Sequence, residues 1–86
     1  MSIFVNKHVV KVLADLAIFL EFTNEDLLNQ DVAIEMMEQM AAELRLTNQE
    51  ERLSLSKTFD EVSNEFTNSL HKDFVKNLCN SLGIND

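Results

Sequence analysis

Hydrophobic residues recur along most of this chain at spacings of three and four, the pattern of a helix with one apolar face. Short polar runs rich in Asn, Thr and Ser interrupt the pattern, so we predict four helices. They cover roughly residues 7–22, 31–46, 48–67 and 70–82. Connections this short favour a compact, largely antiparallel four-helix bundle. The expected fold class is all-α, in a single domain over residues 1–86.

The third predicted helix has the cleanest period. Its inward positions follow at i, i+4, i+7 and i+11, and they are Leu55, Phe59, Val62 and Phe66. The candidate N-caps of the four helices are Asn6, Asp31, Thr47 and Ser69. Thr47 with Glu50 three residues later matches a capping box, and Gly83 stands where a C′ glycine ends a helix.

The first predicted helix is apolar on nearly all sides. Its apolar residues are Val9, Val10, Val12, Leu13, Leu16, Ala17, Ile18, Phe19, Leu20 and Phe22. A helix of this kind is either buried centrally or shares one side with another chain. Full burial of one helix is hard to arrange in a domain this small, so a homodimer through the first helix stays open beside central burial.

The second predicted helix has an apolar side and an acidic side. The apolar side holds Ala33, Met36, Met37, Met40, Ala41 and Leu44. On the acidic side Asp31, Glu35 and Glu38 are spaced i, i+4 and i+7, and like charges at i, i+4 cost a helix a few tenths of a kcal/mol. We expect Met37 and Met40 in the core, and Met36, nearer the acids, on a binding surface.

The charge of the chain is acidic and unevenly placed. Its 15 acids and 7 bases give a formal charge of −8, and Glu21 to Glu43 holds no Lys or Arg. Such a field repels nucleic acid and anionic membranes and attracts basic partners, so neither nucleic acid nor a membrane is an expected partner. The alternative is that the acids only keep a small protein soluble. The 45% apolar content excludes a disordered acidic chain.

The sequence offers little for catalysis. Cys79 is the one cysteine, and no triad pattern surrounds it or the two histidines, His8 and His71. Glu35-x-x-Glu38 lacks the Glu-x-x-His partners of a dimetal bundle, so we expect no enzyme activity, metal or cofactor. A lone cysteine favours a reducing compartment, and the apolar run before Leu20 is too short for a membrane span. We therefore expect a cytoplasmic protein.

Two stretches together carry a family resemblance. Glu38–Leu44 (EQMAAEL) is followed by Asn48–Arg52 (NQEER), and Phe74–Leu78 (FVKNL) by Ser81–Ile84 (SLGI). In this order they resemble small acidic helical proteins that are encoded beside secreted antibacterial toxins and act as immunity proteins. The resemblance implies a protein without catalysis that binds a cognate toxin, often over a basic active site.

The expected function is therefore neutralisation of a toxin with a basic surface through stoichiometric binding. The candidate contact residues are Glu25, Asp26, Glu35, Met36, Glu38 and Glu43. An alternative acidic face holds Asp60, Glu61 and Glu65. Two rival hypotheses are a homodimeric structural or regulatory module and an acidic mimic that occupies a nucleic-acid-binding protein.

Overall fold

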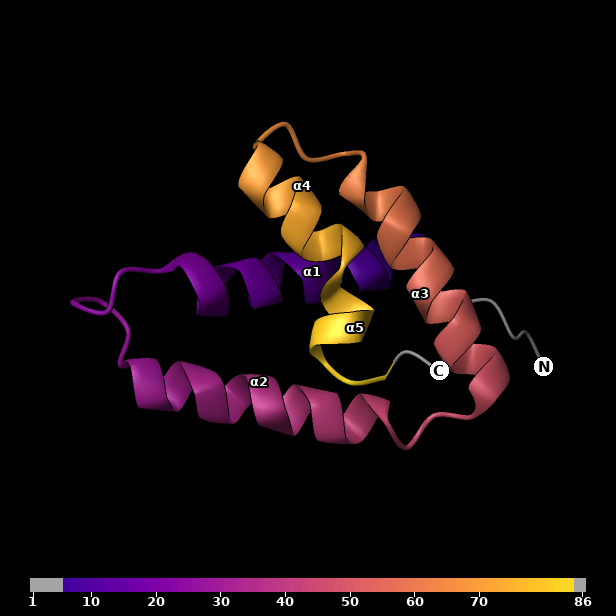
Figure 1. Cartoon of the computed structure of the whole chain (residues 1–86), viewed down its shortest axis with the longest axis horizontal. Coiled ribbons are helices and arrows are strands. Elements are labelled where there is room, and N and C mark those ends of the chain that lie inside the picture. The colour runs from indigo at the N-terminus through magenta and orange to yellow at the C-terminus, as the bar shows by residue number, and fades with distance from the viewer. Residues whose placement is uncertain (1–5, 85–86) are drawn as a thin grey trace.

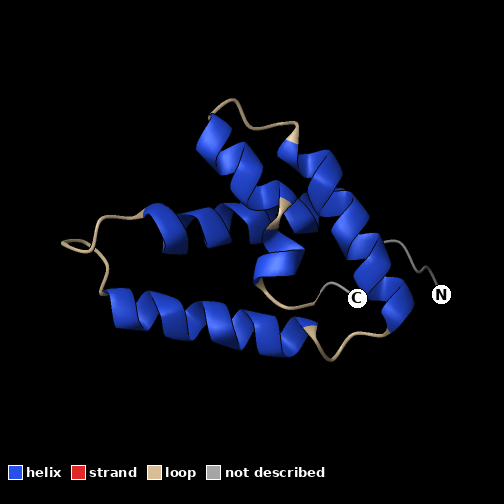
Figure 2. Ribbon diagram, viewed as in Figure 1, coloured by secondary structure: helices blue, strands red, loops and turns tan. Residues whose placement is uncertain are grey.

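The regular structure of the chain is helical. A computed structural model describes residues 6–84, and no strand occurs in that range (Figures 1 and 2). The helices are α1 (Lys7–Phe22), α2 (Gln30–Leu44), α3 (Gln49–Ser63), α4 (Ser69–Lys76) and α5 (Leu78–Ser81). The all-α class is thus confirmed, whereas the two ends of the predicted domain, residues 1 and 86, lie outside the described residues.

The helices are arranged around α1 and α3. In Figure 1, α1 and α2 run side by side in opposite directions, and α3 crosses this pair obliquely at one end. α3 packs against α1, α4 and α5, while α2 packs chiefly against α1. The arrangement as an antiparallel four-helix bundle is not confirmed, because α3 lies oblique and the last predicted helix is divided into α4 and α5.

An asparagine directly precedes each of α1 to α4. The side chains of these four asparagines accept hydrogen bonds from backbone N–H groups in the first turn of the helix. Asn6 is confirmed as the cap of α1. Asp31 is wrong as the cap of α2, since its own backbone N–H donates to Asn29 Oδ1 at 2.9 Å. Ser69 is likewise wrong, because Asn68 Oδ1 accepts from the N–H of Leu70 at 2.9 Å. Asparagine is about as good an N-cap as aspartate or serine, so the residue type alone does not decide against Asp31 or Ser69.

The capping box of α3 lies one residue later than predicted. Asn48 and Glu51 form it: Glu51 N–H donates to Asn48 Oδ1 at 2.8 Å, and Asn48 N–H donates to Glu51 Oε1 at 3.0 Å. The Thr47 hydroxyl instead donates to the carbonyl of Leu44 at 2.6 Å, at the end of α2. The assignment of Thr47 and Glu50 is therefore wrong, because Thr47 is already engaged with the preceding helix.

The last two of the four predicted helices differ from the observed ones: the third ends earlier than its periodicity predicts, and the fourth is interrupted. α3 ends at Ser63 rather than near residue 67, and the Ser63 hydroxyl donates to the carbonyl of Asp60 at 2.6 Å. Such local side-chain bonds offer the backbone an alternative to further helix. Asn77 leaves helical geometry, with φ −102° and ψ 9°, and thereby separates α4 from α5. Gly83 is confirmed as the C′ glycine, with φ +70°.

The core lies between α1, α3 and the C-terminal helices. The largest fully buried side chains are Phe59, Leu78, Val10, Val62 and Val75. Phe66, the last residue of the predicted apolar period, is half-buried against this core. α2 adds little to it, because its buried residues are Ala33 and Ala41 while Met37 and Met40 are only half-buried. The prediction of two core methionines is therefore only partly confirmed.

Candidate binding surfaces

The acidic residues between α1 and α2 are exposed. Glu25 and Asp26 lie in the connection between these helices, where the side chain of Asn24 accepts the Asp26 N–H at 2.8 Å and holds a turn. Their carboxylates make no ion pair within residues 6–84. This connection therefore presents two exposed negative charges that have no ion-pair partner within the described residues.

The acids of α2 are also exposed and unpaired within the described chain, but they do not share one side of the helix. Glu35 and Glu38 lie three residues apart, so they project to neighbouring positions. Glu43 follows Met36 by seven residues and lies on the same side as that methionine, about a quarter of a turn away from Glu35. The predicted contact set is thus divided into a Glu35–Glu38 side and a Met36–Glu43 side.

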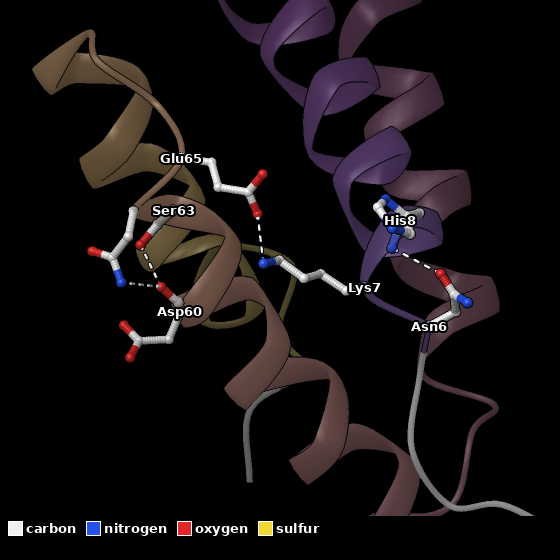
Figure 3. Close-up of polar contacts among 7 residues, drawn as sticks. Asn6, Lys7, His8, Asp60, Ser63 and Glu65 are labelled. Atoms are coloured by element: carbon white, nitrogen blue, oxygen red, sulfur yellow. Dashed lines mark hydrogen bonds and ion pairs between the residues drawn. The ribbon is translucent and has the colours of Figure 1, made fainter.

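The alternative acidic face is partly neutralised within the chain. Glu65 Oε2 lies 3.1 Å from the Lys7 ammonium, so that the connection after α3 is tied to the start of α1 (Figure 3). Asp60 and Glu61 are exposed in the last turn of α3, where the macrodipole disfavours negative charge. The carbonyl of Asp60 accepts the Ser63 hydroxyl, while the carboxylate stays unpaired (Figure 3). This face therefore carries less uncompensated charge than the surface near α2.

A groove of about 530 Å³ separates α2 from the C-terminal helices. Its lining includes Ile34 and Glu38 from α2, Leu20 from α1 and Phe74 from α4. Arg45 closes one end, because its guanidinium donates to the carbonyl of Leu82 at 3.2 Å. The groove brings one carboxylate of the predicted set, that of Glu38, beside apolar side chains.

The groups considered for chemistry are dispersed. Burial raises the pKa of the Cys79 thiol to about 11, although a hydrogen bond with Ser56 acts in the opposite direction. The thiol is therefore protonated at neutral pH and a poor nucleophile. His71 packs its ring against Phe22, with 4.9 Å between centroids, while His8 lies in the first turn of α1. Within residues 6–84 no three His, Cys, Asp or Glu side chains are grouped to hold a metal ion.

The apolar residues of α1 are divided between two opposite sides. The side facing the core carries Val10, Ala14 and Ala17, which are fully buried, and Leu13 and Ile18 pack against the core beside them. The opposite side carries larger residues that are about half exposed, and they are Val9, Val12, Leu16 and Phe19. Central burial of the first helix, one of the two predicted alternatives, is therefore wrong. The sequence indicated that α1 is apolar on nearly all sides, but not which side of the helix would face the core of the domain.

No family model, curated protein or solved structure matches the chain. The resemblance to immunity proteins therefore stays a prediction, as do the predicted lack of enzyme activity and the predicted partners. Among the described helices, none has both the length and the apolar content required to cross a membrane.

Proposed function

We propose that this chain is a cytoplasmic immunity protein, which binds and neutralises a cognate antibacterial toxin without a cofactor. The observation that carries the proposal is an exposed group of carboxylates around α2 that form no ion pair among residues 6–84, those of Glu25, Asp26, Glu35, Glu38 and Glu43. An acidic surface of this kind complements a basic toxin site, as the family resemblance implies.

The physical advantage of such a surface is speed of capture. Charge complementarity steers the encounter and raises association rates from about 10⁵–10⁶ M⁻¹s⁻¹ towards 10⁸–10⁹ M⁻¹s⁻¹. A few apolar anchors within the contact then slow dissociation. Ile34 and Phe74 in the groove beside Glu38 supply apolar surface for such anchors. The proposed contact therefore centres on Glu35 and Glu38, with the loop carboxylates of Glu25 and Asp26 at its edge.

The experiment starts with a pull-down from the native cell, in which mass spectrometry identifies what the tagged chain binds. The partner expected is one stoichiometric, larger protein with a toxin-like C-terminal domain and a basic surface. Glu35→Lys combined with Glu38→Lys is then compared with Asp60→Lys combined with Glu61→Lys, which changes the net charge equally. The first pair should abolish protection and weaken affinity at least about tenfold, whereas the second should not.

Three outcomes decide against the proposal. If both charge reversals weaken binding equally, net charge rather than the α2 surface drives it. Recovery of a DNA-binding protein, with binding that weakens steeply with salt, favours the acidic-mimic hypothesis. Recovery of this chain alone favours a homodimeric structural or regulatory module without a toxin partner.

A further inference from the structure

α1 carries large apolar side chains on the side away from the core as well as on the side facing it. Leu13 and Ile18 pack against the core, whereas Leu16 is 50% and Phe19 is 52% exposed on the opposite side. Burying a side chain as large as Leu or Phe is worth about 1.5–3 kcal/mol. A monomer therefore leaves two large apolar side chains of this helix about half exposed to water. We call the exposed row of Val9, Val12, Leu16 and Phe19 the α1 seam.

The α1 seam has the spacing of a coiled-coil contact. Its four residues follow at i, i+3, i+7 and i+10, the a and d positions of two consecutive heptads. All four are about half exposed, at 50–57%. This row is two positions wide and continuous over three turns of the helix. It therefore fits another helix laid along α1 better than it fits a small molecule or a loop.

α2 extends the seam on the same face of the molecule. Ile34 and Glu38 line the groove on one side of the buried row of α2, so Val32 and Met36 on the other side face away from the groove. The α1 seam likewise faces away, because it lies opposite Ala14, which packs in the core. The six apolar side chains of both helices expose roughly 500 Å², within the range of patches that mark interaction sites.

We propose that this face binds a second copy of the chain, with the two α1 helices packed antiparallel about a two-fold axis. In that arrangement Val9 of one copy meets Phe19 of the other, and Val12 meets Leu16, so each larger side chain faces a smaller one. A parallel pair would place Phe19 against Phe19 and Val9 against Val9. Size complementarity therefore favours the antiparallel order.

The lysines of α1 do not decide the orientation, because both are engaged within the chain. The Lys7 ammonium lies 3.1 Å from the Glu65 carboxylate, and the Lys11 ammonium lies 3.3 Å from that of Asp15. Size complementarity therefore sets the antiparallel order.

The interface reaches the size of a stable one only with α2 and a polar rim included. Standard interfaces bury about 800 Å² on each partner, more than the roughly 500 Å² of apolar surface on this face. In the proposed dimer, the N-terminal half of the partner's α1 would pass over the exposed side chains of Val32 and Met36. The Glu35–Glu38 side of α2 stays outside the contact, so each copy keeps a carboxylate pair free.

The test measures the average molar mass of the protein in solution by sedimentation equilibrium, at protein concentrations from about 1 to 100 μM. The wild-type chain should form a dimer in this range. Leu16→Glu should raise the dissociation constant at least about tenfold, because it places a charge in the seam. Leu53→Glu is the matched control, since Leu53 is 55% exposed on α3, and it should leave the dimer unchanged. Circular dichroism of each variant verifies the fold, and Val12→Asn serves as a second seam variant.

Three results would overturn the proposal: a wild-type chain still monomeric at about 100 μM, a species larger than two chains, or equal effects of Leu16→Glu and Leu53→Glu.

The orientation of the two α1 helices is tested by disulfide cross-linking. The Val9→Cys variant, the Phe19→Cys variant and an equimolar mixture of the two are each oxidised. The antiparallel order predicts disulfides chiefly in the mixture, whereas disulfides within each variant alone contradict it. The native Cys79 does not interfere, because it is buried. None of these readouts involves a toxin, so the dimer and the proposed function can fail separately.

Discussion

Gly83 is the residue whose backbone conformation most clearly requires the absence of a side chain. It ends α5 in the left-handed region, at φ +70°, and its N–H donates to the carbonyl of Asn80 at 3.1 Å. The next N–H, of Ile84, donates to the carbonyl of Cys79 at 3.0 Å, which completes a Schellman motif. Ile84 is thereby carried into the core, where it is 2% exposed.

Gly83→Ala should destabilise the fold by about 1 kcal/mol, since a Cβ is disfavoured at this φ. The added Cβ would also lie 3.4 Å from the Arg45 Nη1 atom, which donates to the carbonyl of Leu82. Urea denaturation measures the free energy of unfolding, with the exposed Ser81→Ala as control. A Gly→Ala change at an ordinary φ stabilises proteins, so a stabilised Gly83→Ala would contradict the left-handed assignment.

Cys79 should couple stability to alkaline pH. Burial raises the pKa of its thiol from 9.0 to about 11, so the folded chain holds a proton that the unfolded chain has lost in this interval. The stabilisation from this group is complete below pH 9 and is lost as the pH rises towards 11. Denaturation of the wild type and of Cys79→Ala at pH 8 and pH 10.5 measures it. The stability difference between them should narrow at the higher pH, and a constant difference would contradict the raised pKa.

At the scale of elements, the sequence predicted α1 most accurately, because a capping asparagine and a long apolar run define both of its ends. The starts of α2, α3 and α4 were missed by about one or two residues, since Asp31, Thr47 and Ser69 each stand within two residues of an asparagine that is at least as good a cap. The division at Asn77 was missed because Phe74, Val75, Leu78 and Leu82 keep one helical period across it. The spacing of apolar residues cannot reveal an interruption of a helix when the apolar residues on both sides of it keep the same helical period.

α2 should be the least protected long helix. Its buried side chains are two alanines, whereas α3 buries Leu55, Phe59 and Val62. Local opening costs less where little apolar surface is lost to water. Hydrogen exchange followed by NMR should show amides in the middle of α2 at least about tenfold less protected than those near Phe59. The monomeric background of Leu16→Glu removes any contribution of a second copy. Equal protection in both helices would mean that α2 opens only with the whole fold.

At the scale of the molecule, the sequence predicted the acidic residues of α2 but not which side of that helix stays exposed. Helical spacing alone divides Glu35 and Glu38 from Met36 and Glu43, but their exposure depends on which side of α2 meets α1. Equally, Leu16 and Ala17 are adjacent apolar residues, and only tertiary packing decides that the alanine is buried. Both questions concern the orientation of a helix that is apolar on more than one side, and local patterns do not settle them.

The two proposed contacts should respond to salt in opposite directions. Two copies with a net charge of −8 each repel one another, so screening should tighten the homodimer as the Debye length falls from about 10 Å at 0.1 M to about 3 Å at 1 M. Screening should weaken binding to a basic toxin over the same interval. Sedimentation equilibrium and binding titrations at both salt concentrations measure the two constants.

Charge reversal on α2 separates these effects. Each Glu→Lys change makes the net charge more positive by two, so Glu35→Lys with Glu38→Lys reduces the net negative charge from −8 to −4. The seam is untouched, and the reduced repulsion should make the dimer tighter at 0.1 M and less sensitive to salt. The same variant should lose the toxin. If the dimer instead weakens with salt in the wild type, repulsion between the two copies does not govern its stability, and this prediction is wrong.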